Sequence, residues 1–84
     1  MENTKNFREF KINDFYSAAI LKTNGFHLRE LERVKGKFVT FVFDDPGHEA
    51  EKVLRKYWAR EIKVVARDLI ENIDELKTRI HAGV

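Results

Sequence analysis

The segment 38–43, FVTFVF, constrains the fold more than any other part of the chain. An unbroken run of β-branched and aromatic residues is typical of a β-strand, whose successive side chains point to opposite faces of the sheet. The run therefore carries apolar side chains on both faces: Val39, Phe41 and Phe43 on one, Phe38 and Val42 on the other. We expect this strand at the centre of a sheet, with one face covered by helices. The second face must be covered as well, or it forms a contact surface.

The length of the chain limits what can surround this strand. The 84 residues are 43% hydrophobic, which is ordinary for a folded domain. A domain of this size buries only about 60–65% of its unfolded surface, which leaves room for one small sheet and one layer of helices. Residues 1–6 are polar and are expected to be flexible, so the single domain spans residues 7–82. An enclosed pocket would remove much of its core, so neither an enzyme nor a small-molecule substrate is expected.

Several classes of protein are disfavoured by what the composition lacks. The chain has no cysteine, which removes disulfides, thiolate zinc sites and cysteine nucleophiles. No apolar run approaches the roughly 20 residues that span a bilayer. Residues 1–6 also lack the apolar core of a signal peptide. We therefore expect a cytoplasmic protein that does not contact a membrane.

The first half of the chain predicts a strand, a helix and a second strand. Residues 7–12 alternate like a short strand, and Asn13 is a suitable cap for a buried helix over 14–23. Gly25 can adopt the left-handed conformation that closes such a helix. Residues 26–34 change hydrophobic phase part-way, which indicates a strand with a bulge near Arg29-Glu30. A tight turn at Lys35-Gly36 then leads into the central strand.

The second half predicts two helices. Asp44 or Asp45 can cap an amphipathic helix over 48–59, a connector follows over 60–64, and residues 66–81 repeat apolar groups at helical spacing. The order β-α-β-β-α-α predicts an α+β domain with a small antiparallel sheet of about three strands and helices packed on one face. Four aromatic residues are expected in the core, because such residues dominate burial in small domains: Phe41, Phe43, Tyr57 and Trp58.

Two patterns have the residue types of a metal site, and neither predicts one. Asp44, Asp45, His48 and Glu49 lie close in sequence, but acids at a helix N-terminus are favoured by the helix dipole without any metal. Asp45 followed by Glu61-Ile62-Lys63 has the outline of a metal-dependent nuclease. That chemistry requires the Glu-x-Lys in a strand beside the first acid, whereas a long helix intervenes here. No catalytic residue, metal or cofactor is therefore predicted.

Charge is more informative than any catalytic motif. Within residues 52–67 lie six cations, opposed only by Glu61, and we call them the basic ridge: Lys52, Arg55, Lys56, Arg60, Lys63 and Arg67. The first three lie opposite the apolar stripe of their helix. The ridge is either a nucleic-acid-binding surface or a solvated face neutralised by Glu51–Arg55 and Glu49–Lys52 pairs. A second basic cluster occupies the preceding hairpin: Arg29, Arg33, Lys35 and Lys37.

A protein contact is the competing hypothesis. Phe38 and Val42 lie on the strand face opposite the expected helices, where they are candidates for a homodimer interface or a partner groove. The two functions predicted are accordingly a non-enzymatic nucleic-acid-binding module and, as the alternative, a protein–protein interaction module or homodimer.

Five segments carry a resemblance to a known family: residues 12–21, 24–26, 41–45, 57–58 and 73–77. They resemble a family of small uncharacterised domains in bacterial, archaeal and phage genomes, known as a domain of unknown function. The resemblance covers about residues 8–80 and consists mostly of core positions and turns. It implies no activity, cofactor or catalytic residue. The occurrence of that family in phage and mobile elements implies a nucleic acid or a host protein as partner.

Overall fold

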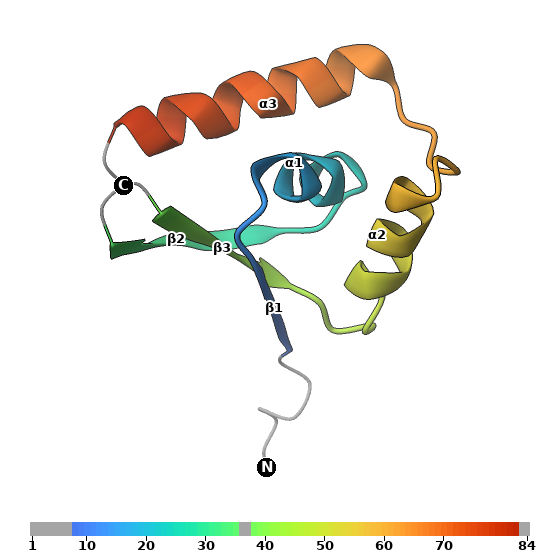
Figure 1. Ribbon diagram of the computed structural model, residues 1–84, viewed down its shortest axis with the longest axis horizontal. Helices are drawn as coiled ribbons and strands as arrows, with labels where there is room; N and C mark the ends of the chain where they lie inside the picture. Colours follow the sequence, from blue (N-terminus) through green and yellow to red (C-terminus); the bar gives the residue numbers. More distant parts are fainter. Residues whose placement is uncertain (1–7, 36–37, 83–84) are drawn as a thin grey trace.

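The computed structural model describes residues 8–35 and 38–82. Three strands and three helices follow one another as β1 (Glu9–Ile12), α1 (Phe15–Thr23), β2 (Leu28–Lys35), β3 (Phe38–Asp44), α2 (Ala50–Trp58) and α3 (Ala66–His81) (Figure 1). The predicted α+β class and the order β-α-β-β-α-α are confirmed. The predicted flexible segment 1–6, and Gly36 of the predicted turn, lie outside the described ranges.

The sheet has β3 at its centre, as its apolar faces predicted. The strand order is β1-β3-β2, and both pairings are antiparallel. The register shifts between Leu28 and Glu30, which confirms the bulge expected near Arg29. Leu28 pairs with Phe43 and Leu31 with Phe41, so the extra residue lets both leucines face the helices although they are three positions apart. The bulge therefore explains the phase change in the sequence.

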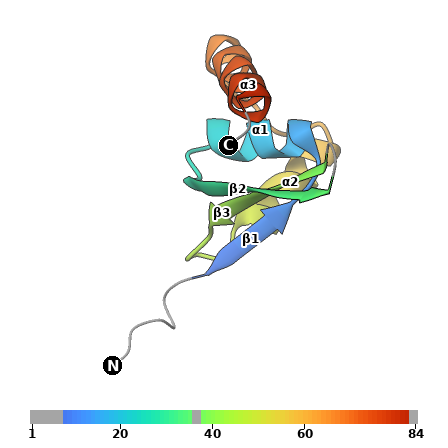
Figure 2. The same ribbon diagram turned by 90° about the vertical axis from the view of Figure 1, so that its left-hand side faces the viewer.

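Helix α1 lies between the sheet and α3, so the domain has three layers (Figure 2). The segment 17–21 of α1 is buried, and Ala18 and Ala19 have no exposed surface. Two contacts join α3 to the side of α1 away from the sheet: Asn72 Nδ2 donates to Thr23 Oγ1 at 3.0 Å, and Lys22 Nζ lies 3.1 Å from Glu75 Oε1. The helices lie on one face of the sheet, as predicted, but α3 packs mainly on α1.

The cap of α1 differs from the prediction. Asp14, not Asn13, is the N-cap, and its carboxylate accepts a hydrogen bond from the Ser17 amide at 2.9 Å. Asn13 Nδ2 instead donates to the carbonyl of Val39 at 3.1 Å and to Thr40 Oγ1 at 2.9 Å. Both residue types can cap a helix. Because the Asn13 side chain is hydrogen-bonded to β3, Asp14 takes the cap position. Gly25, at φ 94°, closes the helix as expected.

Helix α2 is shorter than the predicted range 48–59. His48 has a φ of 56°, so the backbone is not helical there, and the helix begins at Ala50. The helix lies beside α1 at one end of the molecule (Figure 1). No helix among the described residues is long and apolar enough to cross a membrane.

Candidate nucleic-acid interface

Asp45 positions the helix that carries half of the basic ridge. Its carboxylate accepts the Glu49 amide at 2.8 Å through Oδ1 and the Ala50 amide at 3.2 Å through Oδ2. These two bonds satisfy the backbone donors of the N-cap residue and of the first residue of α2, neither of which has a helical partner. Asp45 is 4% exposed. The N-cap residue itself is Glu49, and Asp45, one of the two predicted caps, accepts these hydrogen bonds from four residues before it. The start of α2 is therefore fixed, which turns Ala50 and Leu54 into the core and the cations outward.

The basic ridge is exposed along its whole length. Arg67 pairs with Glu71, its Nε lying 3.2 Å from Oε2. Within the described ranges the other five cations form no ion pair: Lys52, Arg55, Lys56, Arg60 and Lys63. The Glu51–Arg55 and Glu49–Lys52 pairs of the alternative interpretation are not formed. Within the part of the chain that the structure describes, most of the ridge therefore lacks a direct carboxylate partner.

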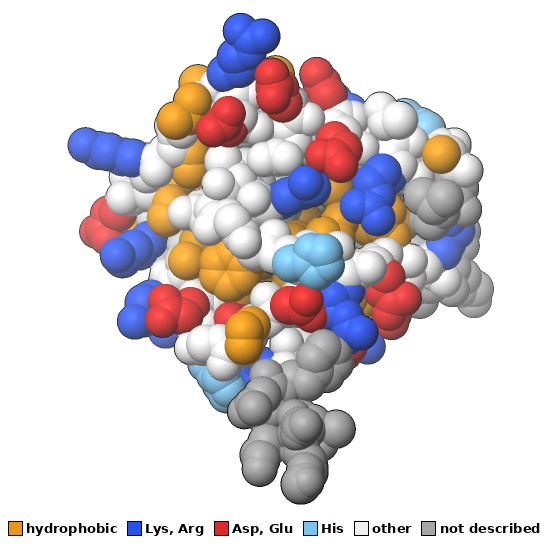
Figure 3. Space-filling model, turned by 180° about the vertical axis from the view of Figure 1, so that it is seen from behind, with side chains coloured by type: hydrophobic (Ala, Val, Ile, Leu, Met, Phe, Trp, Pro, Cys, Tyr) orange, Lys and Arg blue, Asp and Glu red, His pale blue; other side chains and the backbone are white. Residues whose placement is uncertain are grey.

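The segments that carry the ridge lie along one edge of the molecule (Figure 1). Lys52, Arg55 and Lys56 project from α2, Arg60 and Lys63 from the connector, and Arg67 from the first turn of α3. Seen from behind, Lys and Arg side chains project from the edge that carries α2, at the left of Figure 3, with some Asp and Glu side chains among them. An elongated edge with several exposed cations suits a ligand with repeated negative charges.

Arg60 occupies an unusual backbone position on this edge. Its φ is 64°, in the left-handed region that glycine adopts at the least cost. The Arg60 amide donates to the Tyr57 carbonyl at 3.0 Å, and the Glu61 amide donates to the Lys56 carbonyl at 2.8 Å. This pair of bonds is a Schellman motif, in which the left-handed residue is usually glycine. A cation therefore stands at a position where glycine would be less strained.

Trp58 is not a core residue, contrary to the prediction. It is the last residue of α2 and is 63% exposed, while Tyr57 packs partly against the core. At about 100° per residue, Trp58 lies roughly 90° away from the buried centre of the α2 stripe. The position of Trp58 at the margin of the apolar stripe could have indicated its exposure from the sequence. An apolar residue at such a margin is covered only if another element lies beside it.

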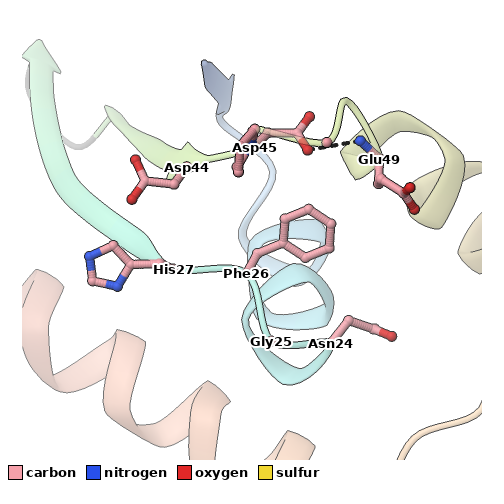
Figure 4. A pocket seen from close by; sticks show the side chains of 9 residues that line it. Asn24, Gly25, Phe26, His27, Asp44, Asp45 and Glu49 are labelled. Atoms are coloured by element: carbon pink, nitrogen blue, oxygen red, sulfur yellow. Dashed lines mark hydrogen bonds between the residues drawn. The ribbon is translucent and has the colours of Figure 1, made fainter. Parts of the chain in front are cut away.

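A hollow of about 430 Å³ lies elsewhere, between the loop after α1 and the turn after β3 (Figure 4). Phe26 and His27 line one side of it, and Asp44, Asp45 and Glu49 line the other. The Asp45 carboxylate turns toward the Glu49 amide that it caps. Asp44 Oδ1 lies 3.3 Å from Arg29 Nε. Two of the acids therefore already have partners.

The metal patterns in the sequence do not converge in space. Among the described residues, no group of three or more His, Asp or Glu side chains is placed to hold a metal ion. Glu61 and Lys63 lie in the connector between α2 and α3, outside every strand. The strand pairing that a nuclease site requires beside Asp45 is therefore not formed.

The two residues of the predicted protein interface differ in exposure. Phe38 is 71% exposed, whereas Val42 has no exposed surface. Val42 pairs in register with Lys11 of β1 and Glu30 of β2, so charged residues flank it on both sides. Of the two, only Phe38 offers apolar surface to a partner.

The second basic cluster is partly engaged within the domain. Arg29 Nη1 lies 2.8 Å from Glu9 Oε2 across the sheet, and Arg33 Nη2 donates to the Ile80 carbonyl at 3.0 Å. Lys37 lies outside the described residues. These contacts leave the basic ridge as the main group of unpaired cations in the described part of the chain.

Comparison with known proteins places the chain in a family. No curated protein and no solved structure matches the sequence. A family model, Domain of unknown function (DUF5659), matches residues 7–82, which agrees with the resemblance expected from the core positions and turns. The chain therefore belongs to the family Domain of unknown function (DUF5659).

Proposed function

We propose that this domain is a non-enzymatic nucleic-acid-binding module that contacts phosphates through the basic ridge. The observation that carries the proposal is the set of five exposed cations without ion pairs within the described residues, along one edge. A phosphate that meets an unpaired cation does not have to displace an internal carboxylate. Each contact then releases counterions from the nucleic acid, which drives binding at low salt.

The backbone at Arg60 supports the same function. Residues held in sparsely populated conformations cluster at functional sites. A positive φ that glycine would tolerate better is kept at an arginine, and that arginine lies between the cations of α2 and Lys63. The guanidinium suits phosphate because its planar set of donors can form two parallel hydrogen bonds.

Charge reversal tests the proposal. In a mobility-shift titration at low salt, the protein is expected to bind both duplex and single-stranded DNA, and Arg55→Glu/Lys56→Glu is expected to abolish the shift. The double variant changes the net charge from +2 to −2, since each reversal subtracts two. Circular dichroism should show an intact fold, because both side chains are exposed.

A matched pair of single variants distinguishes the effect of losing a ridge cation from the effect of lowering the net charge. Lys56→Glu and Lys77→Glu each lower the net charge by two, and both lysines are exposed on helices and unpaired within the described residues. Lys56→Glu is expected to weaken binding, whereas Lys77→Glu, near the far end of α3, should change it little. The absence of any shift for the wild-type protein at low salt would overturn the proposal.

The second candidate function is a protein contact centred on Phe38. Its exposed fraction of 71% favours this candidate, because an exposed phenyl ring gains free energy when a partner covers it. The partner would be a second copy or, for a chain encoded by a phage or mobile element, a host protein. Light scattering decides the homodimer version, which a monomeric mass would exclude.

A further inference from the structure

Trp58 borders a hollow that the basic ridge alone does not explain. The hollow has a volume of about 270 Å³ and lies between β1 and α2. Its apolar lining comes from Phe10, Ile12 and Leu54. The indole of Trp58 forms part of the wall and is 63% exposed. An indole left in water next to an apolar hollow is a surface on which a flat, apolar group can stack.

The hollow has a positive side chain and a negative side chain at different places in its wall. Arg55 lies one helical turn before Trp58 on the same side of α2 and forms no ion pair among the described residues. Glu51 lies a further turn toward the start of the helix and also lines the hollow. A phosphate is attracted by Arg55 and repelled by Glu51. An anionic group is therefore favoured at the Trp58 end, where the basic ridge continues into Arg60.

From this juxtaposition we infer that the hollow takes an unpaired nucleobase, stacked on Trp58, with its phosphate at Arg55. The inference rests on the proposed nucleic-acid binding and adds to it a base contact that only single strands can form. A base in a duplex is already stacked on both faces and cannot present a face to Trp58 without flipping out. Proteins that bind single strands combine a positive track for the backbone with aromatic side chains that stack on bases, and the ridge and Trp58 supply these two parts.

The protein carries its own probe for this inference. Trp58 is the single tryptophan of the chain, so its fluorescence reports on this site alone. Titration with a short single-stranded oligonucleotide is expected to quench the emission, whereas a duplex of equal phosphate content should bind with little quenching. Unchanged emission while the single strand binds, as measured by anisotropy of a labelled oligonucleotide, would overturn the inference.

Substitutions separate the base contact from the phosphate contacts. Trp58→Ala is expected to weaken single-strand binding by about five- to a hundredfold and to leave duplex affinity within about twofold. Trp58→Phe should retain part of the affinity, because phenylalanine still offers a flat ring. Phe38→Ala, which removes another exposed aromatic ring away from the hollow, is the matched control and should change neither affinity.

The outcomes distinguish this inference from the proposed function. If neither nucleic acid binds, the proposed function fails and the inference fails with it. If both bind and Trp58→Ala weakens neither, the ridge binds phosphates while the stacking role is wrong. That second result would also follow if the hollow held an apolar side chain of a protein partner.

Discussion

Replacement of Phe41 by alanine is expected to lower the free energy of unfolding by about 3–5 kcal/mol. Phe41 is 1% exposed at the centre of β3, and its register partners are Ile12 of β1 and Leu31 of β2. Its ring also meets that of Phe15, with the centroids 6.3 Å apart and the planes at 66°. Removal of the ring leaves a cavity where the sheet meets α1, and the main chain of a central strand cannot readily collapse into it.

Chemical denaturation monitored by circular dichroism measures this loss. A domain of 84 residues has a total stability of about 4–13 kcal/mol, so Phe41→Ala removes a large part of it. Phe38→Ala is the matched control, because Phe38 lies on the same strand and is 71% exposed. The control should cost less than about 1 kcal/mol. Equal midpoints for the two variants would contradict the position of β3 between the helices and the open face.

Leu76→Ala is expected to cost about 2–5 kcal/mol and to loosen α3 more than the sheet. Of the α3 residues, all of which the structure describes, only Leu76 is buried, and its exposed fraction is 0%. Because α3 packs mainly on α1, loss of this one side chain removes much of its attachment. Hydrogen exchange should show α3 amides losing protection before those of β3.

The control for this experiment lies on the same helix. Ile70 is 58% exposed, so Ile70→Ala removes a similar volume without opening a cavity, and it should leave the stability nearly unchanged. Equal protection of α3 in the Leu76→Ala variant and the wild-type protein would show that α3 is held by other contacts.

The elements of the fold could be predicted because each leaves a periodic pattern. The bounds of α3 coincide with the predicted range 66–81, and the bulge at Arg29 follows from the phase change between Leu28 and Leu31. The three-layer arrangement could not be predicted. Helix α1 is apolar on most sides, which indicates that it is buried, but the sequence does not show which element covers each side. The choice of Asp14 over Asn13 as a cap depends on a hydrogen bond to Val39, which lies 26 residues away in the chain.

The candidate site was predictable only in part. The six cations of the ridge are evident from their density, but their ion pairs depend on side-chain positions that spacing alone does not determine. Glu51 and Arg55 stand four residues apart and could have paired, and in the structure both instead line the Trp58 hollow. Val42 has the same alternation as Phe38, yet it is buried because it lies mid-sheet between Lys11 and Glu30.

The most direct test of phosphate binding by the basic ridge uses Arg60, the ridge residue with a positive φ. Arg60→Gly removes one cation and relieves the positive φ, so binding should weaken while the melting temperature stays level or rises. His48→Gly relieves a φ of 56° at a residue outside the ridge and is the matched control.

The measurement is the affinity for a single-stranded oligonucleotide at a series of salt concentrations. The logarithm of the wild-type association constant is predicted to fall linearly with the logarithm of the salt concentration. The slope should be shallower by about 0.7 for Arg60→Gly, the value for one lost phosphate contact, and unchanged for His48→Gly. An affinity that does not depend on salt, or equal slopes for the two glycine variants, would contradict the assignment of the ridge to phosphate binding.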